Sequence, residues 1–276
     1  MILAYLKSKT KTENIPNMFK GTDFLQSVKT IKSLEEYIIH VDFASQKIFE
    51  SNKIWFRGHA NKNYKLIPSI FRTKEYSIES EKNLTEEFLD KAKGFIAGQN
   101  FDNHEWYFLM QHFGLKTRLL DWTEGYLFAL FFALKLNKGD NQFIDPCIWI
   151  INPEELNMLS INKTSIIRTN DDSNKTLISE YLNFQNQKKE LPIAISPTYS
   201  NERVLRQKGC FTLHSGNQTI NSVYKKNNIN RIVKINISYK ERNQMLEQLK
   251  LAGISESSIF PDLEGLSREL NSKYKF

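Results

Sequence analysis

The stretch from Leu109 to Leu136, "LMQHFGLKTRLLDWTEGYLFALFFALKL", joins a long apolar run to polar groups that are costly to bury without hydrogen-bonding partners. Its second half, "EGYLFALFFALK", is apolar nearly all round and predicts a helix in the interior of the protein. Before it, a helix over 104–113 is predicted to end at Gly114. We therefore interpret the stretch as a helix end, a polar loop and a buried helix, with the loop as the wall of a candidate site.

Helical and strand patterns alternate in the rest of the chain. Ser33 and Glu36 form a capping box ahead of a helix predicted over 34–49, and another helix is predicted over 79–97. Strands are predicted in "KIWFRGHA", "PCIWIIN", "CFTLHS" and "RIVKINIS". The regular βαβ rhythm of a doubly wound sheet is missing, so we expect an α+β fold with a mixed or antiparallel sheet flanked by helices.

The domain organisation follows from the same pass along the chain. Residues 1–32 are predicted to be an N-terminal preface and residues 33–270 a single domain. Between 157 and 190 the sequence is polar and rich in Asn, Ser and Lys, which indicates an excursion over the surface.

Composition favours a folded protein with a basic surface. The 38 Lys and Arg residues outnumber the 31 Asp and Glu residues, and the resulting charge of +7 favours anionic ligands or nucleic acid without identifying either. Cys147 and Cys210 lie in apolar, strand-like surroundings and are expected to be buried free thiols. The longest apolar run is about half the ~20 residues that cross a bilayer, so we expect no membrane contact and a cytoplasmic protein.

The five histidines are scattered along the chain. They are His40, His59, His104, His112 and His214. Because none of them has the short spacing of a zinc or two-metal site, no metal is predicted.

Four motifs carry a resemblance to a known family. They are "WFRGHANKNYKLIPSIFR", "LMQHFGLKTRLLDWTEGYLFALFFAL", "RVLRQKGCFTLHS" and "SIFPDLEGLSREL". In this order they resemble the FRG domain family, named for its aromatic-Arg-Gly motif, here Phe56-Arg57-Gly58. The resemblance covers roughly residues 33–270 and implies a prokaryotic-type domain met in contexts suggestive of phage defence or toxin action.

The order of motifs also resembles that of ADP-ribosyltransferases, with weaker support. In those enzymes an Arg at the end of an early strand precedes a Ser or Thr motif that leads into an apolar helix, and a late Glu engages a ribose hydroxyl of NAD. Here Gln207 occupies the late position, and an amide binds a hydroxyl but is not a general base near neutral pH. The resemblance would then require Glu202, Asp262 or Glu264 to supply the carboxylate.

Arg57 and Gly58 begin the set of candidate site residues. The planar fork of Arg57 suits two-point binding of a pyrophosphate or carboxylate, and an ion pair with Asp121 is equally consistent with the sequence. Gly58 is predicted to serve a tight turn. Arg72 is either a second phosphate contact or a solvated surface residue.

The polar part of the opening stretch supplies the other candidates. His112 and Arg118 flank Gly114 and are expected to orient a ligand, although His112 also fits a core or cap histidine. Asp121, Trp122 and Thr123 precede the buried helix. They would either cap it or form one end of a nucleotide pocket in which Trp122 stacks on a base.

Two functions follow from these candidates. In the first, an ADP-ribosyltransferase-like domain takes NAD or a related nucleotide and acts on a macromolecular target; Arg57 holds phosphate, and His112, Thr123 and Gln207 are the catalytic set. In the second, the chain is a non-catalytic nucleic-acid-binding or regulatory module, which the basic tract "KKNNINRIVKINISYKER" would serve.

Overall fold

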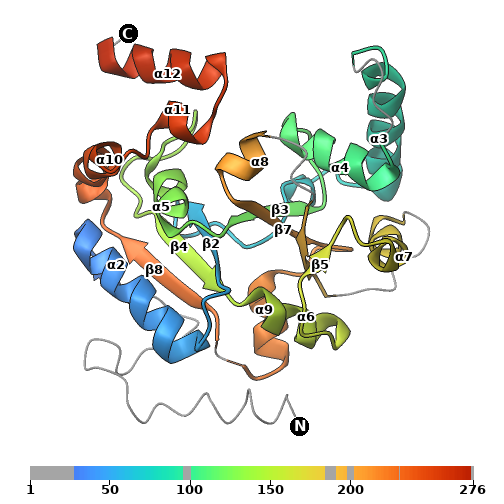
Figure 1. Cartoon of the computed structure of the whole chain (residues 1–276), viewed down its shortest axis with the longest axis horizontal. Coiled ribbons are helices and arrows are strands. Elements are labelled where there is room, and N and C mark those ends of the chain that lie inside the picture. Colours follow the sequence, from blue (N-terminus) through green and yellow to red (C-terminus); the bar gives the residue numbers. More distant parts are fainter. Residues whose placement is uncertain (1–27, 96–100, 184–190, 198–201, 230, 275–276) are drawn as a thin grey trace.

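The computed structural model describes residues 28–95, 101–183, 191–197, 202–229 and 231–274. Its centre is one eight-stranded mixed sheet in the order β1-β8-β4-β2-β3-β7-β6-β5 (Figure 1). The strands are β1 (Val28–Ile31), β2 (Trp55–His59), β3 (Leu119–Thr123), β4 (Cys147–Ile151), β5 (Ile167–Arg168), β6 (Ile193–Ser196), β7 (Gly209–Leu213) and β8 (Val233–Ile237).

The pairing pattern confirms the predicted α+β class with a mixed sheet. The two outer pairs, β1 with β8 and β5 with β6, are parallel, and the inner pairs are antiparallel. Cys147 in β4 and Cys210 in β7 are buried free thiols, as predicted.

Helices cover the sheet on both faces (Figure 1). They are α2 (Leu34–Phe43), α3 (Ile78–Ala92), α4 (Asn103–His112), α5 (Tyr126–Leu134), α6 (Pro153–Ile161), α7 (Asp172–Leu182), α8 (Glu202–Arg206), α9 (Ile220–Lys226), α10 (Arg242–Leu251), α11 (Glu256–Ile259) and α12 (Leu263–Tyr274). The helical segments of other types are the π-helical η2 (Ala44–Phe49) and the 3₁₀-helical η3 (Ile70–Arg72) and η4 (Tyr239–Glu241). Within the described ranges, none of the helices has the length and apolar character needed to cross a membrane.

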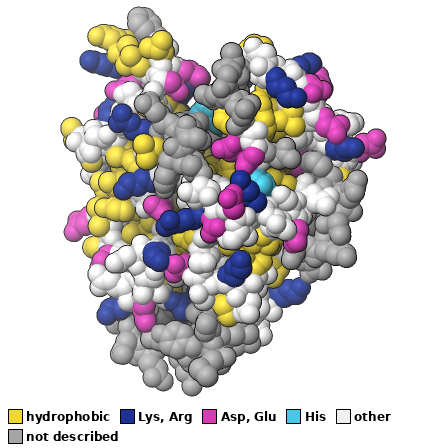
Figure 2. Space-filling model, turned by 45° about the vertical axis from the view of Figure 1, so that its right-hand side comes forward, with side chains coloured by type: hydrophobic (Ala, Val, Ile, Leu, Met, Phe, Trp, Pro, Cys, Tyr) yellow, Lys and Arg dark blue, Asp and Glu magenta, His cyan; other side chains and the backbone are white. Residues whose placement is uncertain are grey.

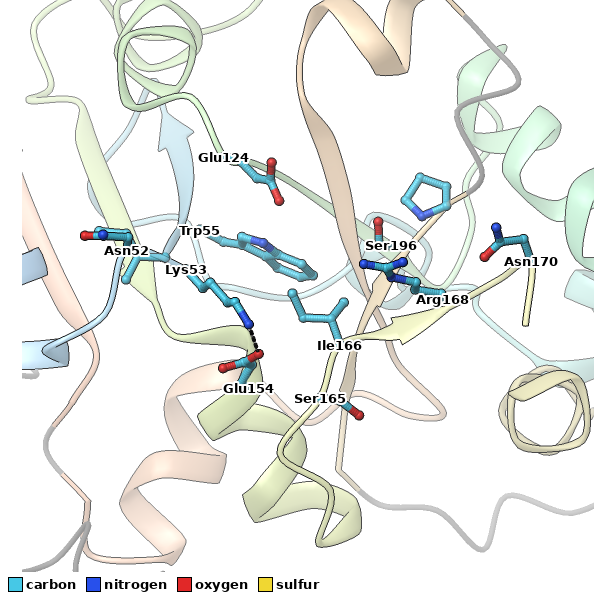
Figure 3. Close-up of a pocket in the computed structure, with 12 residues that line it drawn as sticks. Asn52, Lys53, Trp55, Glu124, Glu154, Ser165, Ile166, Arg168, Asn170 and Ser196 are labelled. Carbon is cyan, nitrogen blue, oxygen red and sulfur yellow. Dashed lines mark hydrogen bonds and ion pairs between the residues drawn. The ribbon is translucent and has the colours of Figure 1, made fainter. Parts of the chain in front are cut away.

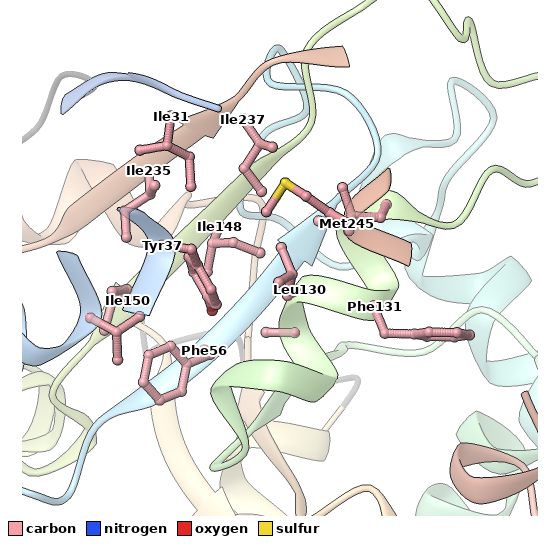
Figure 4. Close-up of a cluster of buried hydrophobic side chains, with 14 of the residues drawn as sticks. Ile31, Tyr37, Phe56, Leu130, Phe131, Ile148, Ile150, Ile235, Ile237 and Met245 are labelled. Carbon is pink, nitrogen blue, oxygen red and sulfur yellow. The ribbon is translucent and has the colours of Figure 1, made fainter. Parts of the chain in front are cut away.

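The main core lies between the sheet and α2, α5 and α10 (Figure 4). Side chains from one face of β2, β4 and β8 meet the apolar residues of α5, which confirms the buried helix expected from "FALFFAL". The labelled members are Ile31, Tyr37, Phe56, Leu130, Phe131, Ile148, Ile150, Ile235, Ile237 and Met245. Burial on this scale is the chief favourable term in folding, so the α5 face is expected to be the most stable part of the molecule.

Gly58 lets α5 pack directly on β2. A Cβ atom at this position would lie 2.1 Å from the carbonyl oxygen of Ala129 and 2.6 Å from the backbone nitrogen of Ala133. Gly58 lies within β2, so the predicted tight turn is wrong. The residue is needed because helix and strand approach more closely here than any side chain permits.

The predicted polar loop before α5 is instead a strand. Leu119–Thr123 forms β3, which pairs with β7 over its whole length, and α5 begins after an N-cap at Gly125. Leu120 and Trp122 enter one apolar cluster and Leu119 enters another on the opposite face. A central strand with buried residues on both faces, here all of β3 except Asp121, lacks the alternation that identifies a half-buried strand, which explains the error.

Several elements were not predicted from the sequence, among them β1, α7 and α9. β1 falls in the predicted preface 1–32, α9 ends with the first two residues of the basic tract, and α7 lies in the polar segment 157–190. In α7, Ile178 and Tyr181 are buried against the β6–β7 side of the sheet, so part of that segment belongs to the core.

Candidate functional site

The candidate site lies where the sheet opens between β2 and β3. β2 pairs with β4 through five residue pairs and β3 pairs with β7 through five, but β2 and β3 share the single pair Phe56 and Thr123 among the described residues. A cavity of about 390 Å³ occupies the region beside this pair. Its lining is Phe56, Arg57, Gly58, His59, Ala60, Tyr64, Arg72, Gln111, Asp121, Trp122, Thr123, Phe132, Asn137, Asp140 and Gln207.

Arg57 bridges the opening. Its Nη1 group donates to the backbone oxygen of Asp121 and lies 3.5 Å from the carboxylate oxygen Oδ2 of the same residue. The predicted ion pair is therefore present, and the bond to the backbone takes the place of a missing ladder hydrogen bond. Burial lowers the pKa of Arg57 and the Asp121 charge opposes that shift, so the guanidinium stays a cation at ordinary pH.

His59 lies beside Arg57 on the same face of β2, because alternate residues of a strand share a face. Its Nε2 atom is 2.9 Å from Arg57 Nε, and the ring is 6% exposed. Burial first, and then the charges of Arg57, Arg72 and Lys234, hold the pKa of His59 well below 6.5, so the ring is neutral at pH 7. Sequence reasoning missed this residue, although the two-residue spacing within "FRGH" was a usable signal.

Asp121 is held from the other side of the opening by α4. Its side chain is 56% exposed, and Oδ1 accepts a hydrogen bond of 2.8 Å from Gln111 Nε2. The amide oxygen of Gln111 in turn accepts from the Thr117 hydroxyl. This chain orients a carboxylate toward the cavity, and Gln111 is a second site residue that the sequence predictions omitted.

Further charged groups line the outer part of the cavity. Arg72, at the end of η3, is exposed. The Tyr64 hydroxyl donates to Asp140 Oδ1 at 2.9 Å, and Asp140 Oδ2 accepts from the backbone nitrogen of Asn137 at 2.8 Å. With Arg57 and Asp121, the cavity therefore presents guanidinium donors and carboxylate acceptors together.

Thr123 and Gln207 close the opposite wall. The Thr123 hydroxyl donates to the backbone oxygen of Gln207 at 2.6 Å and accepts from Gly125 nitrogen at 3.0 Å. The Gln207 amide nitrogen donates to the backbone oxygen of Ile259 in α11 at 3.2 Å. Both predicted residues line the cavity, and these bonds tie its wall to the start of α5 and to the C-terminal helices.

His112 and Arg118 are not among the residues that line the cavity. Arg118 is fully buried and binds both carboxylate oxygens of Glu81 in α3 at distances from 2.7 to 2.9 Å. His112, the last residue of α4, is half-buried and packs edge-on against Phe113 with 4.9 Å between ring centroids. The sequence places both near Gly114, but α4 and the start of β3 direct Arg118 away from the opening.

Trp122 lines the cavity yet is packed in the core, with 3% of its surface exposed. Its indole nitrogen donates to the Thr212 hydroxyl at 3.1 Å, and that hydroxyl is 3.0 Å from Nε2 of His214. His214 Nδ1 lies 3.2 Å from the backbone oxygen of Gln218. The chain of bonds fixes the indole in place, so Trp122 does not offer a ring face for a base to stack on.

Because His214 is buried, we expect the protein to lose free energy of unfolding in acid. Burial lowers its pKa from 6.5 to about 3, so from about pH 6.5 down to about pH 3 the unfolded state binds a proton that the folded state does not. The free energy of unfolding should therefore fall as pH decreases through this window. Urea unfolding at about pH 4.5 and about pH 7 should show a larger loss for the wild type than for His214→Gln, and equal losses would contradict the assignment.

Two of the alternative carboxylates for a transferase role, Asp262 and Glu264, do not line the cavity. Asp262 Oδ1 accepts from Gly265 nitrogen at 2.7 Å at the start of α12, and Glu264 pairs with Arg268 at 2.6 Å. The side chains of Glu202 and Arg203 lie outside the description. The carboxylates that line the cavity are Asp121 and Asp140.

A second cavity, of about 720 Å³, opens at the end of the sheet where β2 begins and β5 and β6 end (Figure 3). On one side Lys53 Nζ pairs with Glu154 at 2.8 Å, and on the other lie Arg168 and Ser196. None of the predicted site residues lines this cavity.

The basic tract does not form one surface. Lys225 and Lys226 are exposed at the end of α9, but Arg231 is buried and donates to the backbone oxygen of Phe49 at 2.9 Å. Lys234 donates to a backbone oxygen and lies over the Trp149 ring. On the face shown in Figure 2, basic and acidic side chains are interspersed.

Comparison with known proteins identifies the part of the chain that holds the cavity. The family model of the FRG domain matches residues 52–142. No curated protein and no solved structure matches the chain. The matched segment contains β2, β3 and α5 and every residue of the cavity lining except Gln207. Together, the FRG motif in β2 and this match show that the chain carries an FRG domain.

Proposed function

We propose that the cavity between β2 and β3 binds a nucleotide of the NAD type, with Arg57 and Arg72 contacting its phosphates. The observation that carries the proposal is the combination of two guanidinium groups and two carboxylates around one cavity of about 390 Å³. That volume lies within the range of small-molecule sites.

A nucleotide satisfies both kinds of charge in the cavity. Phosphate oxygens accept charge-assisted hydrogen bonds from guanidinium groups, and Arg presents them in a planar fork. Ribose hydroxyls donate to carboxylates such as Asp121 and Asp140. Tyr64, which is 40% exposed, adds an aromatic ring that suits a base. A simple anion would leave the carboxylates unused.

The resemblance to ADP-ribosyltransferases extends the proposal to transfer of ADP-ribose from NAD to a macromolecular target, in a prokaryotic defence or toxin setting. In this extension Asp121 binds the ribose hydroxyl of NAD, the role of the late Glu in ADP-ribosyltransferases, because it is the exposed carboxylate beside Arg57. Gln207 and Thr123 shape the wall against which the ribose lies. Mass spectrometry of candidate target proteins incubated with NAD would detect the transfer, which Asp121→Asn should abolish while binding persists.

Arg72→Ala is expected to weaken ADP-ribose binding by about tenfold or more, because a charge-assisted phosphate contact is lost. The thermal unfolding temperature should not change, since Arg72 is exposed. Isothermal titration calorimetry with NAD and ADP-ribose measures the effect.

Arg168→Ala provides the matched control. It removes the same charge from the second cavity and should leave the affinity unchanged. Absence of binding by the wild type would overturn the proposal, and a loss of affinity in Arg168→Ala alone would move the binding site to the second cavity.

The alternative function, a nucleic-acid-binding module, has less support. Its basic tract is interrupted by the buried Arg231, which separates the exposed Lys225 and Lys226 at the end of α9 from the exposed Lys240 in η4. Salt-dependent RNA or DNA binding that Lys225→Glu and Lys226→Glu weaken would favour it.

A further inference from the structure

We propose that His59 is a positioning residue that holds the Arg57 guanidinium in the orientation used for phosphate binding. The inference rests on the proposed function of the cavity and goes beyond it by assigning a role to a buried imidazole. His59 is not itself expected to contact the phosphate.

The bond between the two side chains has a defined direction. Arg57 Nε always carries a proton, so His59 Nε2, at 2.9 Å, must accept. A neutral imidazole that accepts at Nε2 carries its proton on Nδ1, which fixes the tautomer of His59 without reference to any hydrogen position.

Arg57 is thereby held at two points. Nε is bound to His59, and Nη1 is bound to the backbone oxygen of Asp121 across the opening of the sheet. Because the guanidinium is planar, two fixed nitrogens fix the third. The described contacts of Arg57 do not use Nη2, which leaves that amino group for a ligand.

The surroundings of His59 keep it an acceptor. His59 is 6% exposed, and its ring packs against the Tyr64 ring with an angle of 67° between the two ring planes. The charged groups that act on it, Arg57 and Arg72 at the cavity and Lys234 in β8, are all cations. Burial is the largest cause of the lowered pKa of His59, and these charges add to it against a backbone hydrogen bond at Tyr64 that raises the pKa, so the imidazole is neutral and able to accept from Arg57.

A purely structural role for His59 makes a different prediction. If the ring served only to pack against Tyr64, His59→Phe would be tolerated and Arg57 would work without it. If the accepting nitrogen matters, His59→Gln should keep the function through its amide oxygen, and His59→Phe should lose it.

Nitrogen-15 NMR of the whole chain tests the bond directly, without any ligand. We expect His59 to show the neutral Nδ1–H tautomer at pH 7, and a coupling across the hydrogen bond between Arg57 Nε and His59 Nε2. A protonated ring, or a proton on Nε2, would overturn the inference.

A double-mutant cycle tests the consequence for ADP-ribose binding. His59→Phe is expected to weaken binding by about tenfold in the wild-type background, and to have no further effect once Arg57→Ala is present. His59→Gln should restore most of the affinity. Additive effects of the two substitutions, or equal affinities of His59→Phe and wild type, would show that His59 does not act through Arg57.

The two proposals can fail separately. If the wild type binds neither NAD nor ADP-ribose, the proposed nucleotide function fails, and the NMR measurement still decides whether His59 holds Arg57. If the wild type binds and the cycle is additive, the nucleotide function stands and the positioning role is lost.

Discussion

Replacing Arg118 by methionine is expected to lower the free energy of unfolding by about 3–5 kcal/mol, because the change leaves the buried Glu81 carboxylate without its partner. Arg118 and Glu81 are 0% and 2% exposed in their side chains. Two further hydrogen bonds support this ion pair. The Tyr107 hydroxyl donates to Glu81 at 3.0 Å, and the Tyr181 backbone oxygen accepts from Arg118 at 3.0 Å. The network fastens α3 and α4 to the sheet.

Urea unfolding of Arg118→Met and of the double variant Arg118→Met with Glu81→Leu separates the charge from the packing. The double variant should regain much of the lost stability, since it removes the unpaired carboxylate as well. A loss below about 1 kcal/mol in the single variant would mean that Glu81 finds another partner or water.

Gly58→Ala is expected to cost about 3 kcal/mol of stability, near the upper end for overpacking, because the added methyl meets backbone rather than a movable side chain. The carbonyl of Ala129, 2.1 Å from the added carbon, cannot yield unless α5 moves away from β2. The same movement would widen the cavity, so ligand affinity should fall together with stability.

Gly216→Ala is the control for Gly58→Ala. A Cβ atom at Gly216 would meet nothing within 4 Å, so its unfolding temperature should stay close to that of the wild type. Thermal unfolding and calorimetry on both variants measure the contrast. A fully stable Gly58→Ala would refute the close contact between β2 and α5.

Local patterns were sufficient for the fold class and for several of the elements. The N-cap at Ser33, the Pro at the start of α6 and the apolar run of α5 all occur where the sequence predicted them, although the Glu36 side chain accepts from the backbone nitrogen of Lys32 and so does not complete the predicted capping box. β3 was not predicted, because a strand buried on both faces resembles a helix or an apolar loop when only neighbouring residues are considered.

The candidate site was predicted in part. The pairing of Arg57 with Asp121 and the presence of Thr123 and Gln207 in one cavity follow the predicted order of motifs. Arg118 was misjudged because its partner, Glu81, is supplied by a distant helix. The face of the sheet to which a residue of a central strand points depends on its position in that strand, and the sequence did not show it. Trp122 points into the core.

The order of the strands has a consequence for how the protein is made. The FRG segment contributes β2 and β3, but their outer neighbours, β4 and β7, and β8, which pairs with β4, are all encoded later in the chain. On the ribosome, the segment that carries most of the cavity residues therefore emerges with unpaired strand edges. Its strand neighbours are complete only when residues up to Ile237, the end of β8, have been synthesised. We expect the nascent chain to depend on chaperones during this interval, and to acquire its cavity only after β7 and Gln207 have been synthesised.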